Sequence, residues 1–239
     1  MEEKKLSLSL VLPGYNEEAS IKETVETGRN VLGSLLERYE IIIVNDGSTD
    51  KTAIIADRLQ EQYPEVTVVH NPINLGVGIS LQIGFQAANC DLVLHNAMDY
   101  PFDLKDLELL LPLFPTWDVV IVSRTDRSAH SLYRKITSLV HFWLVRLLFR
   151  VPFSDMNFVQ VYKRNVLQHL SVKAKSPAFV TPELLIRAKN QGFRITEFKA
   201  PFHPRKKGQA NYGKPRDILW TLADMLSYWI ENSWGKKQS

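Results

Sequence analysis

The stretch HNAMDYPFD, at residues 95–103, follows the fourth strongly apolar run of the chain, and its first carboxylate is Asp99. The residues before it, DLVL, are typical of a strand. In an α/β enzyme, a carboxylate at the C-terminal end of a parallel strand is well placed to bind a metal ion or a sugar. Asp99 is the only acid close to this strand end, whereas a metal site is expected to use two or more. The residues alone leave three interpretations open: a metal site, a reduced metal site or a plain loop.

Three other polar turns follow apolar runs earlier in the chain. Their sequences are PGYNEE, VNDGSTD and NPINLGVG, at residues 13–18, 44–50 and 71–78. Asp46 follows its run directly, and its carboxylate can accept a hydrogen bond from the ring N–H of uracil or guanine. Helix capping by Asn16, Ser48 or Asp50 explains part of these turns. It does not explain why all three turns are rich in polar and Gly residues, and none has the spacing of a Walker loop or a GxGxxG fingerprint.

Short β-rich runs alternate with helical patterns in the first half of the chain. The runs that predict strands are residues 6–13, 40–44, 66–70, 91–95 and 118–122. The segments between them have apolar residues at helical spacing, including LKDLELLLPLF at 104–114. This order predicts an α/β fold with a mostly parallel central sheet and helices on both faces. Ligands of such sheets bind at the carboxyl ends of the strands, where the polar turns fall.

Two longer helical patterns follow, at residues 129–150 and 218–234, and both mix aromatic with polar or charged residues. Their uninterrupted apolar runs are shorter than the ~20 residues that a transmembrane helix requires. A helix with aromatic and basic residues suits a membrane interface. The same pattern also suits a protein core or a dimer interface, and the sequence does not choose among the three.

Composition predicts a globular protein with one large domain, because 45% of the 239 residues are hydrophobic and 23% are charged. The single cysteine excludes an intrachain disulfide and favours a reducing compartment. Residues 1–65 hold 13 acids and 7 bases, whereas 123–151 hold six bases and one acid. The positive second half favours an anionic partner. Nucleic acid is disfavoured as that partner because no recognised binding module accompanies the charge.

A series of motifs occurs in the order seen in family 2 inverting glycosyltransferases: LSLVLPGYNEE, YEIIIVNDGSTDKT, NLGVGISLQIGFQAA, DLVLHNAMD, VIVSR, YRKITS and RKKGQANYGK. Over residues 6–216 the chain most resembles the polyprenyl (dolichyl) phosphate sugar synthase branch. The resemblance implies a nucleotide-diphospho-sugar transferase fold of the GT-A type. It also implies a metal-dependent enzyme that transfers a hexose from a GDP- or UDP-sugar, with inversion, to a polyprenyl phosphate or another anionic acceptor.

On the donor side, the resemblance assigns nucleotide binding to six residues. They are Pro13, Tyr15, Glu17, Asp46, Gly76 and Asp99. The first three match the PxYNE turn that lines the nucleotide pocket, and Asp46 matches the aspartate that reads the base. Asn45 stands where many members of the family have another Asp.

The opening stretch departs from the family pattern MDADLQxxPEDL. Ala97 replaces the first Asp, and Pro101 replaces a Gln that can complete the metal shell. One carboxylate together with diphosphate oxygens and waters can still hold Mg²⁺. Asp99 is therefore the expected ligand of Mg²⁺ or Mn²⁺, with reduced affinity. Asp103 is close enough in the sequence to fold back and complete the metal shell, but capping the helix that follows is a sufficient structural role for it.

On the acceptor side, the resemblance implies that Arg124, Arg134 and Arg205 bind the lipid phosphate and the donor diphosphate, so these arginines and Asp99 are the expected catalytic residues. A guanidinium group can make paired, charge-assisted contacts with phosphate. Other arginines of this region are expected on the surface: Arg127, Arg146 and Arg150. The segment SDMNFVQVYKRNVL lacks the Ser-Gly-Phe of the family, and Asp155 holds the family's aspartate with the spacing one residue short.

Several alternatives stay open. A hydroxyl acceptor would require a base, for which Asp126, His130 and Asp155 are the candidates. The replacements in the metal motif leave room for a catalytically impaired homologue that only binds nucleotide sugars. We expect a catalytic domain at 1–215 and an amphipathic helix at 216–239, packed on that domain or extending from it. Because no signal-peptide pattern is present, we expect a cytoplasmic location, or a peripheral position on the cytoplasmic membrane face. The sequence leaves the oligomeric state open.

Overall fold

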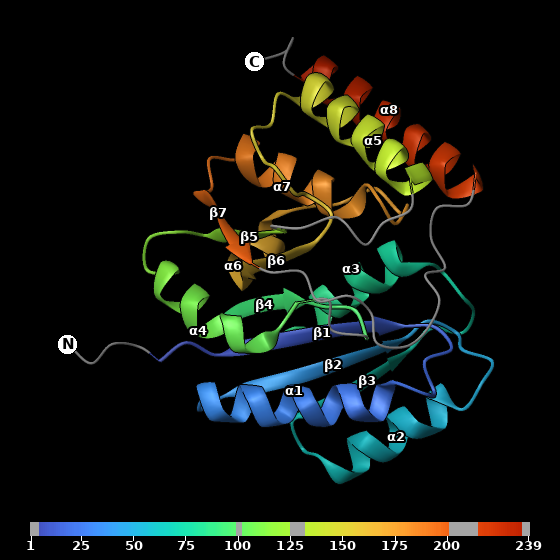
Figure 1. Cartoon of the computed structure of the whole chain (residues 1–239), viewed down its shortest axis with the longest axis vertical. Coiled ribbons are helices and arrows are strands. Elements are labelled where there is room, and N and C mark those ends of the chain that lie inside the picture. Colours follow the sequence, from blue (N-terminus) through green and yellow to red (C-terminus); the bar gives the residue numbers. More distant parts are fainter. Residues whose placement is uncertain (1–4, 99–101, 125–131, 201–214, 236–239) are drawn as a thin grey trace.

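The protein is built on one seven-stranded sheet (Figure 1). The structure, a computed structural model, describes residues 5–98, 102–124, 132–200 and 215–235. In these residues the strands are β1 (Leu8–Gly14), β2 (Tyr39–Asn45), β3 (Val66–His70), β4 (Leu92–His95), β5 (Val119–Arg124), β6 (Val159–Lys163) and β7 (Ile195–Ala200). Their order across the sheet is β3-β2-β1-β4-β6-β5-β7.

The sheet is mostly parallel, as predicted. Strand β1 pairs in parallel with β2 and β4, β2 with β3, and β5 with β7. The exception is β6, which runs antiparallel to both of its neighbours, β4 and β5. The five strands predicted from the sequence are found at nearly the same residues.

Strand β2 shows why the apolar runs are continuous rather than alternating. Successive side chains of a strand point to opposite faces of the sheet. Ile41 and Ile43 belong to the hydrophobic core on one face, and Ile42 and Val44 belong to the core on the other. All four side chains are buried. A strand covered on both faces requires apolar residues at every position.

Two layers of helices cover the sheet. The first layer contains α1 (Ile21–Leu35), α2 (Thr52–Gln62) and the short α4 (Leu107–Leu110). The second contains α3 (Val77–Ala87), α5 (Leu132–Phe149), α6 (Arg164–His169), α7 (Val180–Asn190) and α8 (Pro215–Gly235). In Figure 1 the helices α5 and α8 lie side by side at the end of the molecule farthest from α2. Every predicted helical segment thus contains a helix.

The segment predicted as one helix at 104–114 differs from the prediction. It forms a 3-10 turn (Leu104–Asp106), the short α4, and a second 3-10 turn (Leu111–Leu113). Pro112 lies in the second turn and has no N–H to continue α-helical hydrogen bonding. Its position explains why the apolar pattern does not produce a longer helix.

The two long helices α5 and α8 confirm the helical patterns seen at 129–150 and 218–234. Val145 and Phe149 of α5 and Met225 and Tyr228 of α8 are buried in the core of the second face. Within the described ranges, none of the helices has both the length and the hydropathy needed to cross a bilayer.

Helix α3 packs so closely on the sheet that it requires a glycine. A Cβ atom at Gly84 would overlap Cγ1 of Val11 and lie 3.2 Å from Cγ2 of Val44. We expect Gly84→Ala to lower the free energy of unfolding by about 1–3 kcal/mol, because both obstructing side chains belong to buried strands. Thermal or urea unfolding followed by circular dichroism measures this change.

The matched control is Gly33→Ala in α1, where the atom nearest to a new Cβ is Oη of Tyr39 at 3.5 Å. Alanine favours a helix over glycine, so this variant is expected to be as stable as the wild type or more stable. Equal stability of the Gly84→Ala variant and the wild type would contradict the close packing of α3.

Candidate functional site

The three polar turns predicted from the sequence meet at one edge of the sheet. Gly14 at the end of β1 lies beside Asn45 at the end of β2, and Asn45 lies beside His70 at the end of β3. These are the carboxyl ends of parallel strands, where α/β proteins bind ligands. The edge therefore has the placement expected of a ligand site.

Side chains connect the first turn to the second. The backbone N–H of Asn16 donates to Oγ of Ser48 at 3.0 Å, and Oδ1 of Asn16 accepts from the N–H of Thr49 at 2.8 Å. The N–H of Glu17 donates to Oγ1 of Thr52 at 2.8 Å. Asn16 has a φ of 57°, in the left-handed region that Asn tolerates better than most residues. Asn16 and Ser48 thus join the two turns, in addition to any capping role.

Asp46 ties the second turn to the third. Its side chain is buried, and its Oδ1 accepts hydrogen bonds from Nδ2 of Asn71 at 2.8 Å and from the N–H of Leu75 at 2.9 Å. Its Oδ2 accepts from the N–H of Gly76 at 2.9 Å. A carboxylate has about four acceptor positions, so these three donors leave one position on Oδ2. The sequence pointed to base recognition by Asp46 but not to this structural role.

Gly76 marks the start of α3 and has a φ of 90°, a conformation that L side chains rarely adopt. A Cβ atom at this position would lie 3.9 Å from the ring of Trp220. The first turns of α8 therefore come close to the third polar turn, which sequence reasoning did not predict.

A chain of hydrogen bonds orients Asn45. Its Nδ2 contacts Nδ1 of His70 at 2.9 Å, and Nε2 of His70 contacts Oδ1 of Asp57 at 2.9 Å. Oδ1 of Asn45 accepts from the N–H of Ser48 at 3.2 Å. Because Nδ2 of Asn45 is a donor, Nδ1 of His70 accepts and Nε2–H donates to Asp57. Sequence reasoning missed His70, although its place at the end of the third strand was a usable signal.

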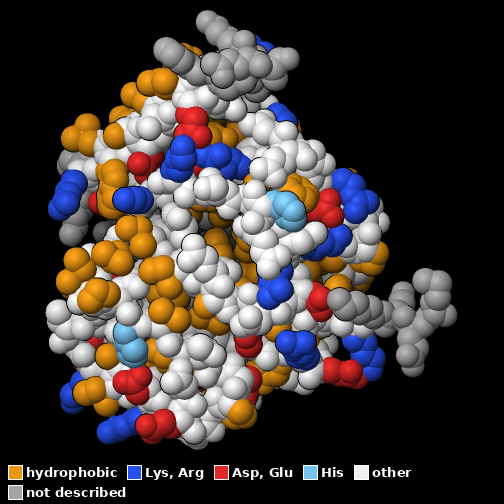
Figure 2. Space-filling view, turned by 180° about the vertical axis from the view of Figure 1, so that it is seen from behind, with side chains coloured by type: hydrophobic (Ala, Val, Ile, Leu, Met, Phe, Trp, Pro, Cys, Tyr) orange, Lys and Arg blue, Asp and Glu red, His pale blue; other side chains and the backbone are white. Residues whose placement is uncertain are grey.

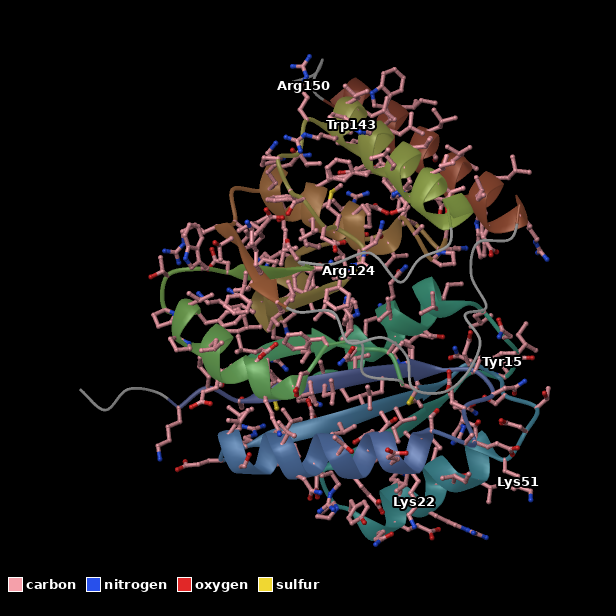
Figure 3. The ribbon with its side chains drawn as sticks, viewed as in Figure 1. Tyr15, Lys22, Lys51, Arg124, Trp143 and Arg150 are labelled. Atoms are coloured by element: carbon pink, nitrogen blue, oxygen red, sulfur yellow. The ribbon has the colours of Figure 1, made fainter. Side chains whose placement is uncertain are left out.

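Tyr15 lies at the same edge and is half-buried, as are Pro13 and Glu17. Figure 3 shows Tyr15 near the carboxyl ends of β1 and β2. Oε2 of Glu17 accepts from Oγ of Ser20 at 2.6 Å, so this carboxylate also stabilises the start of α1. The three residues predicted from the PxYNE turn are thus grouped together next to Asp46.

The segment after β4 is fixed on both sides of Asp99, which itself lies outside the described residues. His95 is buried, and its Nε2 lies 2.9 Å from Oε1 of Gln160. The burial lowers the pKa of the imidazole. Nδ2 of Asn96 donates to the carbonyl of Phe102 at 3.0 Å and so closes the base of the loop. Asp103 accepts from the N–H of Lys105 at 3.0 Å, which confirms its predicted capping role.

A preformed metal centre is not present in the part of the chain that the structure describes, since no three His, Cys, Asp or Glu side chains come together there. This agrees with the replacement of the first acid of the motif by Ala97.

Arg124 and Asp155 form a paired contact at the other part of the site. Nε and Nη2 of Arg124 lie 2.7 and 3.0 Å from Oδ2 and Oδ1 of Asp155. The side chain of Asp155 is 3% exposed and that of Arg124 is 14% exposed. Such a paired, charge-assisted contact holds a guanidinium in one orientation. The side chain of Arg134 and all of Arg205, the two other predicted arginines, lie outside the described residues.

A small cavity lies beside this ion pair. It is lined by Arg124, Ser138, His141, Phe142, Asp155, Met156 and Asn157. Nε2 of His141 is buried there without a hydrogen-bond partner. Burial lowers the pKa of His141 to about 4, so the imidazole is neutral at neutral pH. The cavity therefore presents one guanidinium and one neutral ring nitrogen, and α5 supplies one of its walls.

Comparison with known proteins gives a family for the chain. The model described as glycosyl transferase family 2 matches residues 9–170. Glycosyltransferase AglD of Haloferax volcanii is 31% identical over 233 residues, which make up 94% of this chain and 37% of that protein. Dolichyl-phosphate beta-glucosyltransferase ALG5A of Trichomonas vaginalis is 28% identical over 206 residues, or 80% of this chain and 64% of that protein. The chain thus spans only part of the length of these relatives.

A similar solved structure is glucosyl-3-phosphoglycerate synthase from Mycobacterium tuberculosis, in complex with Mn²⁺, UDP and phosphoglyceric acid. Its TM-score is 0.69 at 22% identity, over 94% of this chain and 78% of that chain. This likeness concerns the fold, and the expected GT-A fold is confirmed.

The dolichyl-phosphate enzyme among the relatives agrees with the polyprenyl phosphate branch that the motifs resemble. Because the family model covers more than half of the sequence, the chain belongs to glycosyl transferase family 2.

Proposed function

We propose that this protein transfers a hexose from a nucleotide diphosphate sugar to a polyprenyl phosphate, with inversion at the anomeric carbon. The observation that carries the proposal is the edge where three polar turns are held together around the buried carboxylate of Asp46. Family membership supports transfer from a nucleotide sugar. The relative named as a dolichyl-phosphate enzyme supports a lipid phosphate acceptor.

The donor nucleotide is proposed to bind against the turns after β1, β2 and β3. Asp46 has one acceptor position left on Oδ2, which suits the ring N–H of uracil or guanine. Tyr15, Pro13 and Glu17 are grouped beside it, and Gly76 allows the third turn to approach closely. The group exposes few fixed charges besides carboxylates, so the diphosphate has to find its positive partners elsewhere.

We assign those partners to Asp99 with a divalent ion and to Arg205. The resemblance to the family's metal motif supports Asp99 as the protein ligand, with the diphosphate itself supplying further oxygen atoms. Mg²⁺ commonly binds in this way, through one or two carboxylates and substrate phosphates. When bound, Mg²⁺ or Mn²⁺ would neutralise charge on the leaving diphosphate.

The acceptor phosphate is proposed to bind at Arg124, with Arg134 as its second arginine. A phosphate oxygen attacks the anomeric carbon, the bond from that carbon to the donor diphosphate breaks, and the nucleoside diphosphate leaves. The acceptor is already anionic at neutral pH, so the step needs no strong base. The protein then contributes orientation and charge neutralisation. A lipid acceptor places the enzyme at the cytoplasmic membrane face.

A hydroxyl acceptor is less well supported by the contacts of Asp155. Both oxygens of this carboxylate accept hydrogen bonds from Arg124, so a substrate hydroxyl would have to compete with that guanidinium for them. The other two candidate bases, Asp126 and His130, lie outside the described residues. A homologue that binds nucleotide sugars without transfer is the remaining alternative, and Ala97 is the residue that favours it.

Nucleotide titration tests the donor site and the metal. We expect either UDP or GDP to bind in the presence of Mn²⁺ and to bind more weakly in EDTA, as measured by calorimetry. Asp99→Ala is expected to remove the metal-dependent part of the affinity, whereas Asp103→Ala, the control in the same loop, is expected to keep it. If neither nucleotide binds, the proposed nucleotide site at the turns after β1, β2 and β3 is wrong.

Substitution of Arg124 tests the acceptor site. Arg124→Lys keeps the positive charge beside Asp155 but loses the paired contacts, so we expect the KM for a short-chain, water-soluble polyprenyl phosphate to rise about tenfold or more. Nucleotide affinity should not change. Arg58→Lys, an exposed arginine of α2, is the control. An unchanged KM in the Arg124 variant would place the acceptor elsewhere.

The hydrogen bonds around Asn45 predict a role for His70 in nucleotide binding. His70→Ala removes the partner that orients Asn45 beside Asp46, and we expect the Kd for the nucleotide to rise about threefold to tenfold. His169→Ala is the control, since His169 contacts the carbonyl of Asn165 on α6. Calorimetry at equal metal concentration measures both. A Kd equal to that of the wild type would mean that Asn45 holds its orientation without His70.

A further inference from the structure

Helix α5 is apolar on two faces. Its inner face is buried in the core through Val145 and Phe149. Its outer face carries large hydrophobic side chains that are between 50% and 70% exposed: Ile136, Leu139, Val140, Trp143 and Leu147. Their spacing places them in one stripe along the helix. Core packing explains the inner face only.

Helix α8 repeats this arrangement next to α5. Its inner face contributes Met225 and Tyr228 to the core. Its outer side chains are between 40% and 69% exposed: Leu219, Leu226, Trp229 and Ile230. Figure 2, which is seen from behind, shows hydrophobic side chains at the upper left, where α8 lies, with both basic and acidic side chains beside them. Contiguous exposed apolar surface of this kind marks an interaction site.

The charges of the two helices identify the partner. Asp224 of α8 points toward the protein and accepts from the backbone N–H groups of Lys175 and Ser176. Glu231 is likewise paired, with Lys173 and Arg187. Arg146, Arg150 and Arg216 are exposed cations of the two helices and of the residue that follows α5, whereas the exposed Glu231 is paired and Asp217 is half-buried. An apolar surface with a cationic margin is complementary to anionic lipid headgroups over acyl chains.

We propose that the outer faces of α5 and α8 form a membrane-docking surface, which lies in the interface of a bilayer containing anionic lipids. Trp143 and Trp229 suit the boundary between headgroups and acyl chains. The guanidinium carbon of Arg146 lies 5.9 Å from the ring centroid of Trp143 and 5.7 Å from that of Phe142, so this exposed cation stays beside the apolar stripe. Figure 3 shows Trp143 and Arg150 on this helical layer.

The docking surface and the candidate acceptor site share a helix. Ser138, His141 and Phe142 of α5 line the cavity that contains Arg124, whereas Leu139 and Val140 face outward. A lipid phosphate that leaves the bilayer beside α5 would therefore reach Arg124 across the width of one helix. This part of the inference rests on the proposed function, while docking itself does not.

Vesicle flotation tests the docking surface. The full chain is expected to float with vesicles of phosphatidylcholine and phosphatidylglycerol, and to float less with phosphatidylcholine alone. Combining Trp143→Ser with Leu147→Ser is expected to lower partitioning about tenfold or more, because both side chains lose apolar burial. Arg146→Glu is expected to weaken binding to the anionic vesicles only. The matched control combines Ile54→Ser and Leu109→Ser, equally exposed residues of α2 and α4.

Three results would overturn the proposal. The wild type could stay off the vesicles, the control could lose binding as much as the α5 variant, or light scattering could show a dimer that the α5 substitutions dissociate. The last result would assign the surface to a second copy of the chain. Transfer to a water-soluble short-chain acceptor without vesicles is measured in parallel. Docking without transfer would count against the proposed function alone, and transfer without docking would count against this surface alone.

Discussion

A carboxylate removed from water needs hydrogen-bond donors around it. At Asp46 this need shapes the sheet edge where we propose that the nucleotide sugar binds. The donors come from Asn71, Leu75 and Gly76, so the turn after β3 closes over the turn after β2. The first turn is then fastened to the second by Asn16 and its partners. The site is therefore built before any ligand arrives. Preorganised donors and acceptors of this kind are what group-transfer enzymes require.

The second region of the molecule depends on α5, which serves the core, the cavity and the outer surface at once. A helix of a globular protein that is apolar around most of its circumference usually has each apolar face covered by other atoms. Here the core covers one face, and the ion pair of Arg124 with Asp155 lies at the border of that face. An acceptor with a long hydrocarbon chain and a charged head would contact both the apolar outside and the guanidinium of Arg124 inside.

The sequence predicted the first half of the fold well because its strands are buried on both faces and read as unbroken apolar runs. It did not predict β6 or its reversed direction, and it did not predict β7, whose side chains are mostly half-exposed. Motif resemblance located the donor turns, since their residues are consecutive in the chain. The contacts of Asp57 and Trp220 could not be predicted, because they depend on how distant elements pack, whereas the place of His70 at the end of β3 was a usable signal. The internal bonds of Asp46 were missed for the same reason.

The reversed strand has a consequence for how the two substrates can be varied. Because β6 runs against its neighbours, the chain passes the site edge just before β6 begins, and Asp155 meets Arg124 at the end of β5. Donor contacts thus come from loops that leave the sheet, and the Asp155 contact comes from a loop that enters it. Changes in length or composition before β6 can alter the acceptor side while the turns around Asp46 stay the same. With the sites proposed above, the fold separates the two specificities along the chain, so that each could evolve without rebuilding the other.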